Sequence, residues 1–293
     1  MKKLILFMLV CLIPSVYVSA QVVRSSKATI HINSKPKSTI ISQTTTPRTT
    51  MTVAPSIKGR YYALVIGIND YADPEISDLD KPIQDAQTFC NTLTSRYTFN
   101  EENIRFLKNP TYAEIYSSFE YFKKRVTPDD NFLIFYAGHG NWDKESEIGY
   151  WLPSDARKTT TRDWLRNSSL KDFLKEIRSK HTLLISDACF GGSIFKTRAA
   201  FSDASTAINM LYELPSRKAM TSGTMTEVPD QSAFIKYMVE RLMNNTEKYL
   251  SSEQLFSSFR LAVINNSGGV VPQYGEIQDV GDQGGDFIFI LKE

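Results

Sequence analysis

The sequence predicts an α/β fold in which a mostly parallel sheet of about six strands is flanked by helices on both faces. Two observations carry this prediction: short apolar runs alternate along the chain with longer amphipathic segments, and glycine-rich turns follow two of the apolar runs. Such alternation gives parallel strands joined by helices that cover the sheet. The expected strands are 61–67, 103–107, 130–137, 181–187, 217–222 and 286–291. The expected helices are 81–97, 111–126, 168–179, 231–244 and 251–266.

The first 20 residues have the organisation of a secretory signal peptide. Lys2 and Lys3 provide the charged start, Leu4 to Ile13 is apolar, and small residues precede a cleavage point after Ala20. The apolar run is shorter than a stable membrane span requires. We therefore expect a secreted or periplasmic protein.

The cysteines are too few for a disulfide framework. Cys11 lies in the predicted signal peptide, and a lipoprotein anchor there fits poorly because the three preceding residues are Met, Leu and Val rather than small residues. Two cysteines remain after signal removal. Cys90 falls within the expected helix 81–97 and is interpreted as a packing residue. Cys189 is then the thiol available for chemistry.

Residues 21–58 differ in composition from the rest of the chain. These 38 positions hold six Ser, eight Thr and six Lys or Arg, with no acidic or aromatic residue. Such a stretch buries too little apolar surface to offset its ordering entropy, so we interpret it as a flexible linker or pro-segment. The chain as a whole carries +2, which leaves −6 for residues 59–293, a length that suits one domain. Ordinary solubility charge explains this split; alternatively, the basic segment docks in an acidic cleft of its own domain.

Two of the expected strands end in residues that carry chemistry. Strand 130–137 is followed by Gly138-His139-Gly140, and strand 181–187 leads into Cys189 and two glycines. If these strands are parallel neighbours, His139 and Cys189 meet at the edge of the sheet where α/β proteins bind ligands. An imidazole can hold a thiol as the nucleophilic thiolate, and adjacent backbone N–H groups can hold an oxyanion.

Each residue alone has a plainer interpretation. A single cysteine at a strand end is more often a small buried hydrophobe, and a histidine in a glycine turn is usually structural. The pair is more specific, because His139 precedes Cys189 by 50 positions and glycines flank both. This order and spacing are typical of one class of cysteine peptidase.

The two motifs resemble those of the caspase-like peptidases, on the metacaspase and paracaspase side of that group. The resemblance rests on Tyr136-Ala-Gly-His-Gly140, Ser186-Asp-Ala-Cys-Phe-Gly-Gly-Ser193 and the first-strand sequence Ala63-Leu-Val-Ile-Gly-Ile-Asn69, and it covers roughly 59–293. It implies the caspase-like fold. It also implies a nucleophilic Cys189, a His139 that moves the proton, and an oxyanion hole from the N–H groups of Gly140 and Cys189. In this family a backbone carbonyl commonly orients the histidine.

Specificity is predicted to depend on Asp187. Strand alternation points its side chain to the same side as Cys189, where a carboxylate attracts a cationic substrate side chain. In the family that the motifs resemble, the matching aspartate lies in the S1 pocket and selects Arg or Lys at P1. The plainer alternative is that Asp187 caps a turn. The loop after the first strand holds Asp73, Asp78 and Asp80, from which we choose Asp80 as the second S1 acid.

Other segments also match features of this group. Residues 194–216 lie where its members are often cut into two portions, and the candidate cut sites are Lys196, Arg198, Arg217 and Lys218. The family's groove-lining strand is matched by Met220–Gly223, and its C-terminal features by Pro272–Tyr274 and Gly284–Phe287. The polar stretch with Trp142, Tyr150 and Trp151 is expected to form a hairpin flap beside the site or a plain surface hairpin.

The sequence shows no Walker loop, dinucleotide fingerprint or metal-ligand cluster, so no cofactor is expected. Some metacaspases need Ca²⁺, but no acidic spacing here predicts a Ca²⁺ loop. The predicted function is a secreted cysteine endopeptidase that cuts protein or peptide substrates after Arg or Lys, with no nucleic-acid partner. Two alternatives remain: a catalytically weak relative that acts by binding proteins, and a cysteine hydrolase or transpeptidase acting on non-protein surface material.

Overall fold

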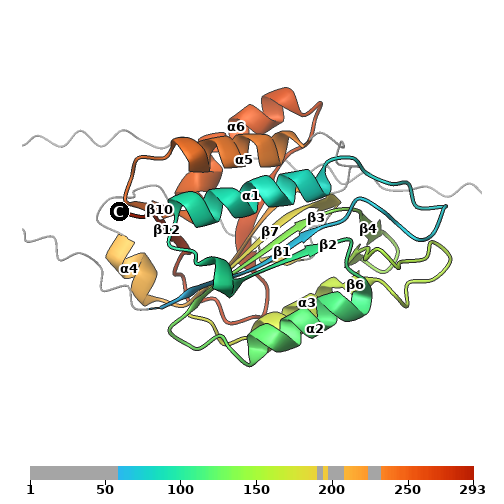
Figure 1. Cartoon of the computed structure of the whole chain (residues 1–293), viewed down its shortest axis with the longest axis horizontal. Helices are drawn as coiled ribbons and strands as arrows, with labels where there is room; N and C mark the ends of the chain where they lie inside the picture. The colour runs from blue at the N-terminus through green and yellow to red at the C-terminus, as the bar shows by residue number, and fades with distance from the viewer. Residues whose placement is uncertain (1–58, 190–193, 197–207, 224–231) are drawn as a thin grey trace, which may run out of the picture. The chain divides into compact units, whose positions relative to one another are not determined.

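The structure, a computed structural model, describes residues 59–189, 194–196, 208–223 and 232–293 (Figure 1). The predicted signal peptide, the basic segment 21–58 and the candidate cut site Arg198 lie outside the described residues. In the part that is described, no helix is long and apolar enough to cross a membrane.

A seven-stranded sheet organises the domain, with strand order β2-β1-β3-β7-β9-β11-β8. The first five strands in this order are parallel: β2 (Ile104–Lys108), β1 (Tyr61–Gly67), β3 (Asn131–Ala137), β7 (His181–Cys189) and β9 (Ser216–Gly223). Every residue of β1, β3 and β9 is buried, as expected for strands covered on both faces. The predicted α/β fold with a mostly parallel sheet is confirmed.

Helices cover both faces of this sheet (Figure 1). One face packs against α1 (Pro82–Arg96), α5 (Ala233–Asn244) and α6 (Ser252–Asn266). The other face packs against α2 (Tyr112–Lys123) and α3 (Asn167–Glu176). All five helices were expected within a few residues of these bounds. A 3-10 turn, η1 (Glu101–Asn103), and a short helix, α4 (Ile208–Glu213), were not.

The far edge of the sheet differs from the prediction. Its sixth strand is β11 (Gln273–Ile277), antiparallel to β9, and the two-residue β8 (Phe195–Lys196) pairs with β11. The expected last strand forms as β12 (Ile288–Ile290), but it pairs with β10 (Tyr249–Ser251) in a separate two-stranded sheet. The β11 sequence holds a glycine and alternates little, so composition alone did not predict a strand there.

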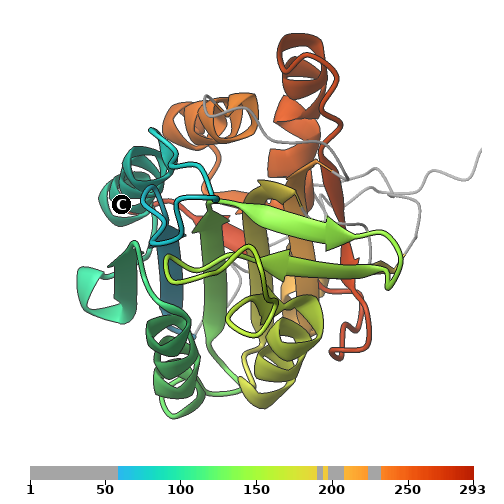
Figure 2. The same ribbon diagram turned by 90° about the vertical axis from the view of Figure 1, so that its right-hand side faces the viewer.

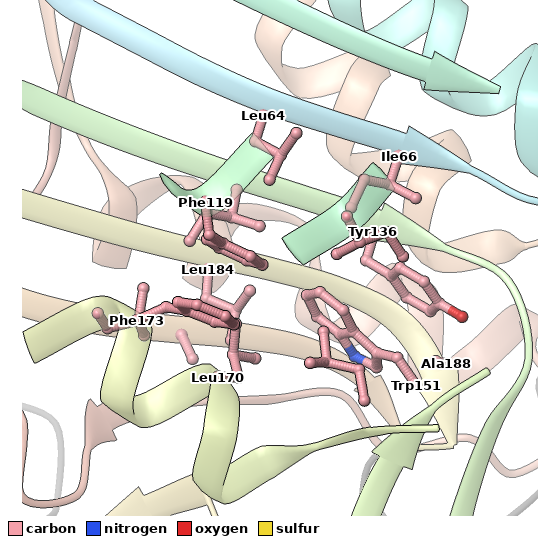
Figure 3. Packing of buried hydrophobic residues seen from close by; sticks show 14 of the residues in the cluster. Leu64, Ile66, Phe119, Tyr136, Trp151, Leu170, Phe173, Leu184 and Ala188 are labelled. Atoms are coloured by element: carbon pink, nitrogen blue, oxygen red, sulfur yellow. The ribbon is translucent and has the colours of Figure 1, made fainter. Parts of the chain in front are cut away.

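The aromatic stretch after β3 forms a small antiparallel sheet of β4 (Gly140–Asp143), β5 (Ile148–Trp151) and β6 (Leu165–Arg166), in front of the central strands in Figure 2. The side chains of Tyr150 and Trp151 in β5 are part of the core. The Trp151 ring stacks on Tyr136 at 4.2 Å, beside the stacked pair Phe119 and Phe173 (Figure 3). The expected hairpin is therefore anchored into the domain through its base.

Candidate active site

Parallel pairing brings the two predicted reactive residues to one edge of the sheet. Strands β3 and β7 are neighbours, and their register pairs Ala137 with Asp187. His139 and Cys189 each lie two residues beyond that pair, His139 just after the end of β3 and Cys189 at the end of β7. The contact continues past the register, because Gly138 N–H donates to the Asp187 carbonyl at 3.5 Å. Gly140 follows at once as the first residue of β4.

A backbone carbonyl orients the imidazole of His139. Nε2 lies 2.8 Å from the carbonyl oxygen of Ser77, in the loop between β1 and α1. A carbonyl only accepts, so in the neutral ring Nε2 carries the proton. Nδ1 then keeps its lone pair and is the nitrogen that can take a proton. The sequence could not single out Ser77, because every residue has a carbonyl and only the loop's path selects one.

Asp187 is buried at this same edge, with 7% of its surface exposed. Burial raises the pKa of Asp187 to about 6, while the hydroxyls of Ser222 and Ser232 oppose part of the rise. Within the described residues, its Oδ1 has no hydrogen-bond partner. A buried carboxyl group with an open acceptor oxygen is suited to receive a cationic group from outside.

A second carboxylate near this region is Asp85, which the sequence analysis did not single out. It lines a cavity of about 430 Å³ at the first turns of α1 and α5, together with Ser232. Because Ser232 is also near Asp187, the cavity and the buried carboxyl belong to the same part of the edge. The available signal was the position of Asp85 in the first turn of a helix that follows the carboxyl end of β1.

The predicted loop acids Asp73, Asp78 and Asp80 lie in the segment between β1 and α1. Asp80 is exposed, and its backbone carbonyl accepts from the Asn69 side chain at 3.1 Å. Asp73 accepts from the backbone N–H groups of Glu75 and Lys158, which lowers its pKa. The Asp78 carboxylate accepts from Tyr71 N–H. Asp73 and Asp78 therefore brace the loop's backbone.

Comparison with known proteins identifies the family of this chain. The family model for the caspase domain, Peptidase C14, matches residues 60–278. The chain belongs to the caspase-domain family. Metacaspase-1 of Eremothecium gossypii is 33% identical over 90 residues, and Metacaspase-1 of Kluyveromyces lactis is 32% identical over 90 residues. Each match covers 28% of this chain and only 20% of the relative, so the chain aligns with about a fifth of their length.

Among solved structures, protein GSU0716 from Geobacter sulfurreducens has the same fold. It superposes with a TM-score of 0.52 at 16% sequence identity, over 78% of this chain and 99% of the other. At that identity the likeness speaks for the fold alone. The family match and the two metacaspase relatives support a cysteine peptidase at the level of the family.

Two of the proposed cut sites in this caspase-domain protein are wrong for the folded state. Arg217 and Lys218 lie within β9 and are buried. The Arg217 guanidinium donates to the carbonyls of Ser179, Lys180 and Ser216, and Lys218 Nζ lies 3.2 Å from a carboxylate oxygen of Asp282. A peptidase needs an extended, accessible segment, which a central strand does not offer. Lys196 lies in β8, where its backbone pairs with Glu276 of β11.

The caspase domain offers no obvious metal centre where it is described. Over residues 59–189, 194–196, 208–223 and 232–293, no group of three or more His, Cys, Asp or Glu side chains is placed to hold an ion.

Proposed function

We propose that this caspase-domain protein is a secreted cysteine endopeptidase that cuts after Arg or Lys. The observation that supports the proposal is the β3–β7 register, which pairs Ala137 with Asp187, two residues before His139 and Cys189 respectively. The Ser77 contact adds a fixed proton position on the imidazole, as a base requires.

In the proposed reaction, His139 takes the proton of the Cys189 thiol, and the sulfur attacks the scissile carbonyl carbon. The backbone N–H groups of Gly140 and Cys189 hold the oxyanion. His139 transfers a proton to the leaving amine as the C–N bond breaks, and a thioester to Cys189 remains. Water, losing its proton to His139, then attacks the thioester and releases the acid, and the thiol regains its proton. The Ser77 carbonyl accepts from Nε2–H throughout, which leaves Nδ1 as the nitrogen that takes up and gives back the transferred proton.

The P1 preference is assigned to Asp187, with a contribution from Asp85. Asp187 is buried, its Oδ1 has no hydrogen-bond partner among the described residues, and a Lys or Arg side chain entering beside it would form a buried ion pair. Such a pair favours ionisation of the carboxyl group, against the burial that raises its pKa. Asp80, whose side chain is exposed, is the weaker choice for the second acid.

The basic segment 21–58 is proposed to be an inhibitory pro-segment of the secreted enzyme. A tethered segment has a local concentration of about millimolar, so weak docking of its Lys and Arg residues would occupy the cleft. The test compares residues 21–293 with 59–293 at low salt, plus a long form whose tail basic residues are Gln. Equal activity of the intact long form and the short form would make the tail a spacer.

The decisive experiment for the function is a series of fluorogenic peptides that differ only at P1, applied to residues 21–293 and to a Cys189→Ala control. We expect cleavage after Arg and Lys by the wild type and none by the control. A protein that folds and cleaves no peptide would instead be tested for partner binding and for hydrolysis of non-protein material. A preference for Asp at P1 would overturn the pocket assignment.

A further inference from the structure

Two tyrosine hydroxyl groups hold the backbone of His139 from opposite sides. The His139 N–H donates to Tyr71 Oη at 2.8 Å, and Tyr136 Oη donates to the His139 carbonyl at 2.6 Å. Tyr136 Oη also lies 3.1 Å from the carbonyl of Leu152, at the end of the β4–β5 hairpin. The N–H and the carbonyl of His139 are therefore both fixed by tyrosine side chains, Tyr71 from the loop after β1 and Tyr136 from β3.

The glycine before His139 leaves space for this arrangement. A Cβ at Gly138 would lie 3.0 Å from Tyr136 Oη and 3.1 Å from Tyr71 Oη, tighter than carbon–oxygen packing normally allows. Any larger residue would push the two hydroxyls away from His139. The glycine of the motif thus serves the approach of two side chains to the histidine backbone.

Tyr71 also contacts the imidazole itself. Its ring centroid is 4.9 Å from that of His139, with the planes at 45°. Tyr71 lies in the same loop as Ser77, whose carbonyl binds Nε2. The loop therefore contacts His139 at its backbone N–H, at its ring face and at one ring nitrogen.

Further hydrogen bonds fix the backbone of the loop that holds Tyr71 and Ser77, so its contacts with His139 depend on one another. The Asp78 carboxylate accepts from Tyr71 N–H at 2.9 Å, which closes the loop around Ser77. Ala72 N–H donates to Ser154 O at 2.8 Å, and Lys158 N–H donates to the Asp73 carboxylate at 2.8 Å. These bonds attach the loop to the segment that follows the β4–β5 hairpin.

We infer that Tyr71 is a positioning residue for His139, whose hydroxyl and ring hold the imidazole against the Ser77 carbonyl with its proton on Nε2. Removal of the hydroxyl would leave the His139 N–H without its acceptor and let the ring leave Ser77. The proton could then occupy Nδ1, the nitrogen that must accept a proton. The kinetic consequence rests on the proposed peptidase function, while the effect on the histidine does not.

The test measures the tautomer of His139 by ¹⁵N NMR in histidine-labelled protein, together with peptide cleavage. The chain has three histidines, so the spectrum is simple, and His31→Gln removes one signal. His181 is an internal reference, because burial lowers its pKa to about 3 and it stays neutral above pH 5. The variant is Tyr71→Phe. The matched control is Tyr61→Phe, which removes a buried hydroxyl that donates to the Ile288 carbonyl.

We expect the wild-type His139 to carry its proton on Nε2 when neutral. In Tyr71→Phe, the fraction protonated at Nδ1 should rise about tenfold, and kcat should fall about tenfold with KM within about twofold. Tyr61→Phe should change neither quantity. Wild-type tautomer and kcat in Tyr71→Phe would overturn the inference. A shifted tautomer in a protein whose wild type cleaves nothing would contradict the proposed function and leave the positioning role standing.

A second variant covers the case in which Tyr71→Phe fails to fold. Asp78→Ala removes an exposed carboxylate that fixes Tyr71 N–H, and Glu75→Ala is its control, an exposed carboxylate of the same loop. Asp78→Ala should move the tautomer and kcat in the same direction, about threefold. If Asp78→Ala and Glu75→Ala both match the wild type, the loop does not position His139.

Discussion

Two histidines on neighbouring strands of one sheet show how position decides what an imidazole can do. In both, Nε2 faces a backbone carbonyl: Ser77 O at 2.8 Å for His139 and Tyr212 O at 3.0 Å for His181. In His181, Nδ1 is also bound, 2.9 Å from Ser216 Oγ. For His139, no described residue bonds to Nδ1. The ring of His181, at the amino-terminal ends of the strands, therefore has both nitrogens bonded within the fold. The ring of His139, at the carboxyl-terminal ends of the strands, has Nδ1 left for chemistry.

Burial separates the two rings further. His181 is completely buried, and burial lowers its pKa to about 3, so it stays neutral at any pH at which the protein is used. His139 is only partly buried and follows the end of its strand. The sheet thus has a closed amino edge that stabilises the fold and an open carboxyl edge that carries the proposed site.

The largest expected effect is the loss of peptide cleavage when His139 or Cys189 is replaced, compared with replacement of the other cysteine, Cys90. Cys189→Ala and His139→Ala should each lower peptide cleavage by about 1,000-fold or more, because in the proposed mechanism the first removes the group that bonds to the substrate and the second the group that protonates its leaving amine. Cys90→Ser should retain near wild-type kcat/KM, since Cys90 is a half-buried residue of α1. Near wild-type turnover in either dyad variant would refute the peptidase assignment.

The next largest effect concerns the carboxyl group of Asp187, whose Oδ1 has no hydrogen-bond partner among the described residues. Asp187→Asn keeps the shape of the side chain but removes the charge, and one-sided loss of a buried ion pair costs about 3–5 kcal/mol. The ratio of kcat/KM for P1 Arg over P1 citrulline should fall by hundreds-fold. Glu176→Gln, at an exposed position of α3, serves as the charge-matched control. An unchanged ratio in Asp187→Asn would move the S1 acid elsewhere, with Asp85→Asn as the next variant.

Substitution of His181, at the amino-terminal ends of the strands, should lower the free energy of unfolding and leave catalysis unchanged. His181→Gln disturbs the hydrogen bonds to Ser216 and Tyr212 in a fully buried site, so the free energy of unfolding should fall by about 2 kcal/mol. Urea denaturation followed by tryptophan fluorescence measures this change. Below the unfolding transition, kcat should stay within about twofold of the wild type. A large loss of kcat with unchanged stability would mean that the two edges are not separate in function.

The smallest expected effect is a pH dependence of P1 selectivity. Burial raises the pKa of Asp187 from its usual acidic range to about 6, so the carboxyl group of the free enzyme is ionised above that value and protonated below it. The kcat/KM ratio of P1 Arg over P1 citrulline should therefore fall about tenfold per pH unit below about pH 6. Because both substrates use the same dyad, any effect of pH on the dyad is common to both and does not change the ratio. A ratio that is flat from pH 5 to 8 would contradict a buried S1 acid.

The pKa shifts of His181 and Asp187 make the free energy of unfolding depend on pH in opposite directions. The folded-state pKa of His181 is lowered from 6.5 to about 3, so its contribution is present above pH 6.5 and is lost as the pH falls through that window. Asp187 is raised from 3.8 to about 6, so it favours the folded state at low pH and loses that contribution as the pH rises through 6. His181→Gln should flatten the acid side of the stability curve, and Asp187→Asn should raise stability near pH 7.

The sequence predicted the strands and helices that carry strong periodic patterns, and it expected His139 and Cys189 to meet if strands 130–137 and 181–187 were parallel neighbours. Apolar runs and glycine turns report burial and the ends of strands, but the order of the central strands came from the structure. It missed β11, whose sequence is mixed, and placed 286–291 in the main sheet when it pairs with β10. Edge strands depend on long-range pairing that local patterns do not contain.

The contacts around His139 could not be predicted from the sequence. A carbonyl such as that of Ser77 has no residue-type signature, and the hydroxyl of Tyr71 is selected by the path of the loop. Arg217 and Lys218 were chosen as candidate cut sites because they are basic residues next to the segment where members of the resembled family are often cut. In the fold their long side chains are buried and paired. Asp85 could have been found, since its helix was expected and its first turn follows the end of β1.

The most direct test of the central claim is covalent labelling of the wild type with a thiol-reactive peptide that carries Arg at P1, followed by mass spectrometry of the digested protein. The account predicts a single adduct on Cys189, absent in His139→Ala and blocked by a cleavable P1 Arg peptide. A matched probe with Asp at P1 should leave Cys189 unlabelled. Labelling of Cys90 in preference to Cys189, or equal labelling by both probes, would contradict the assignment of this sheet edge as the site of a basic-specific cysteine peptidase.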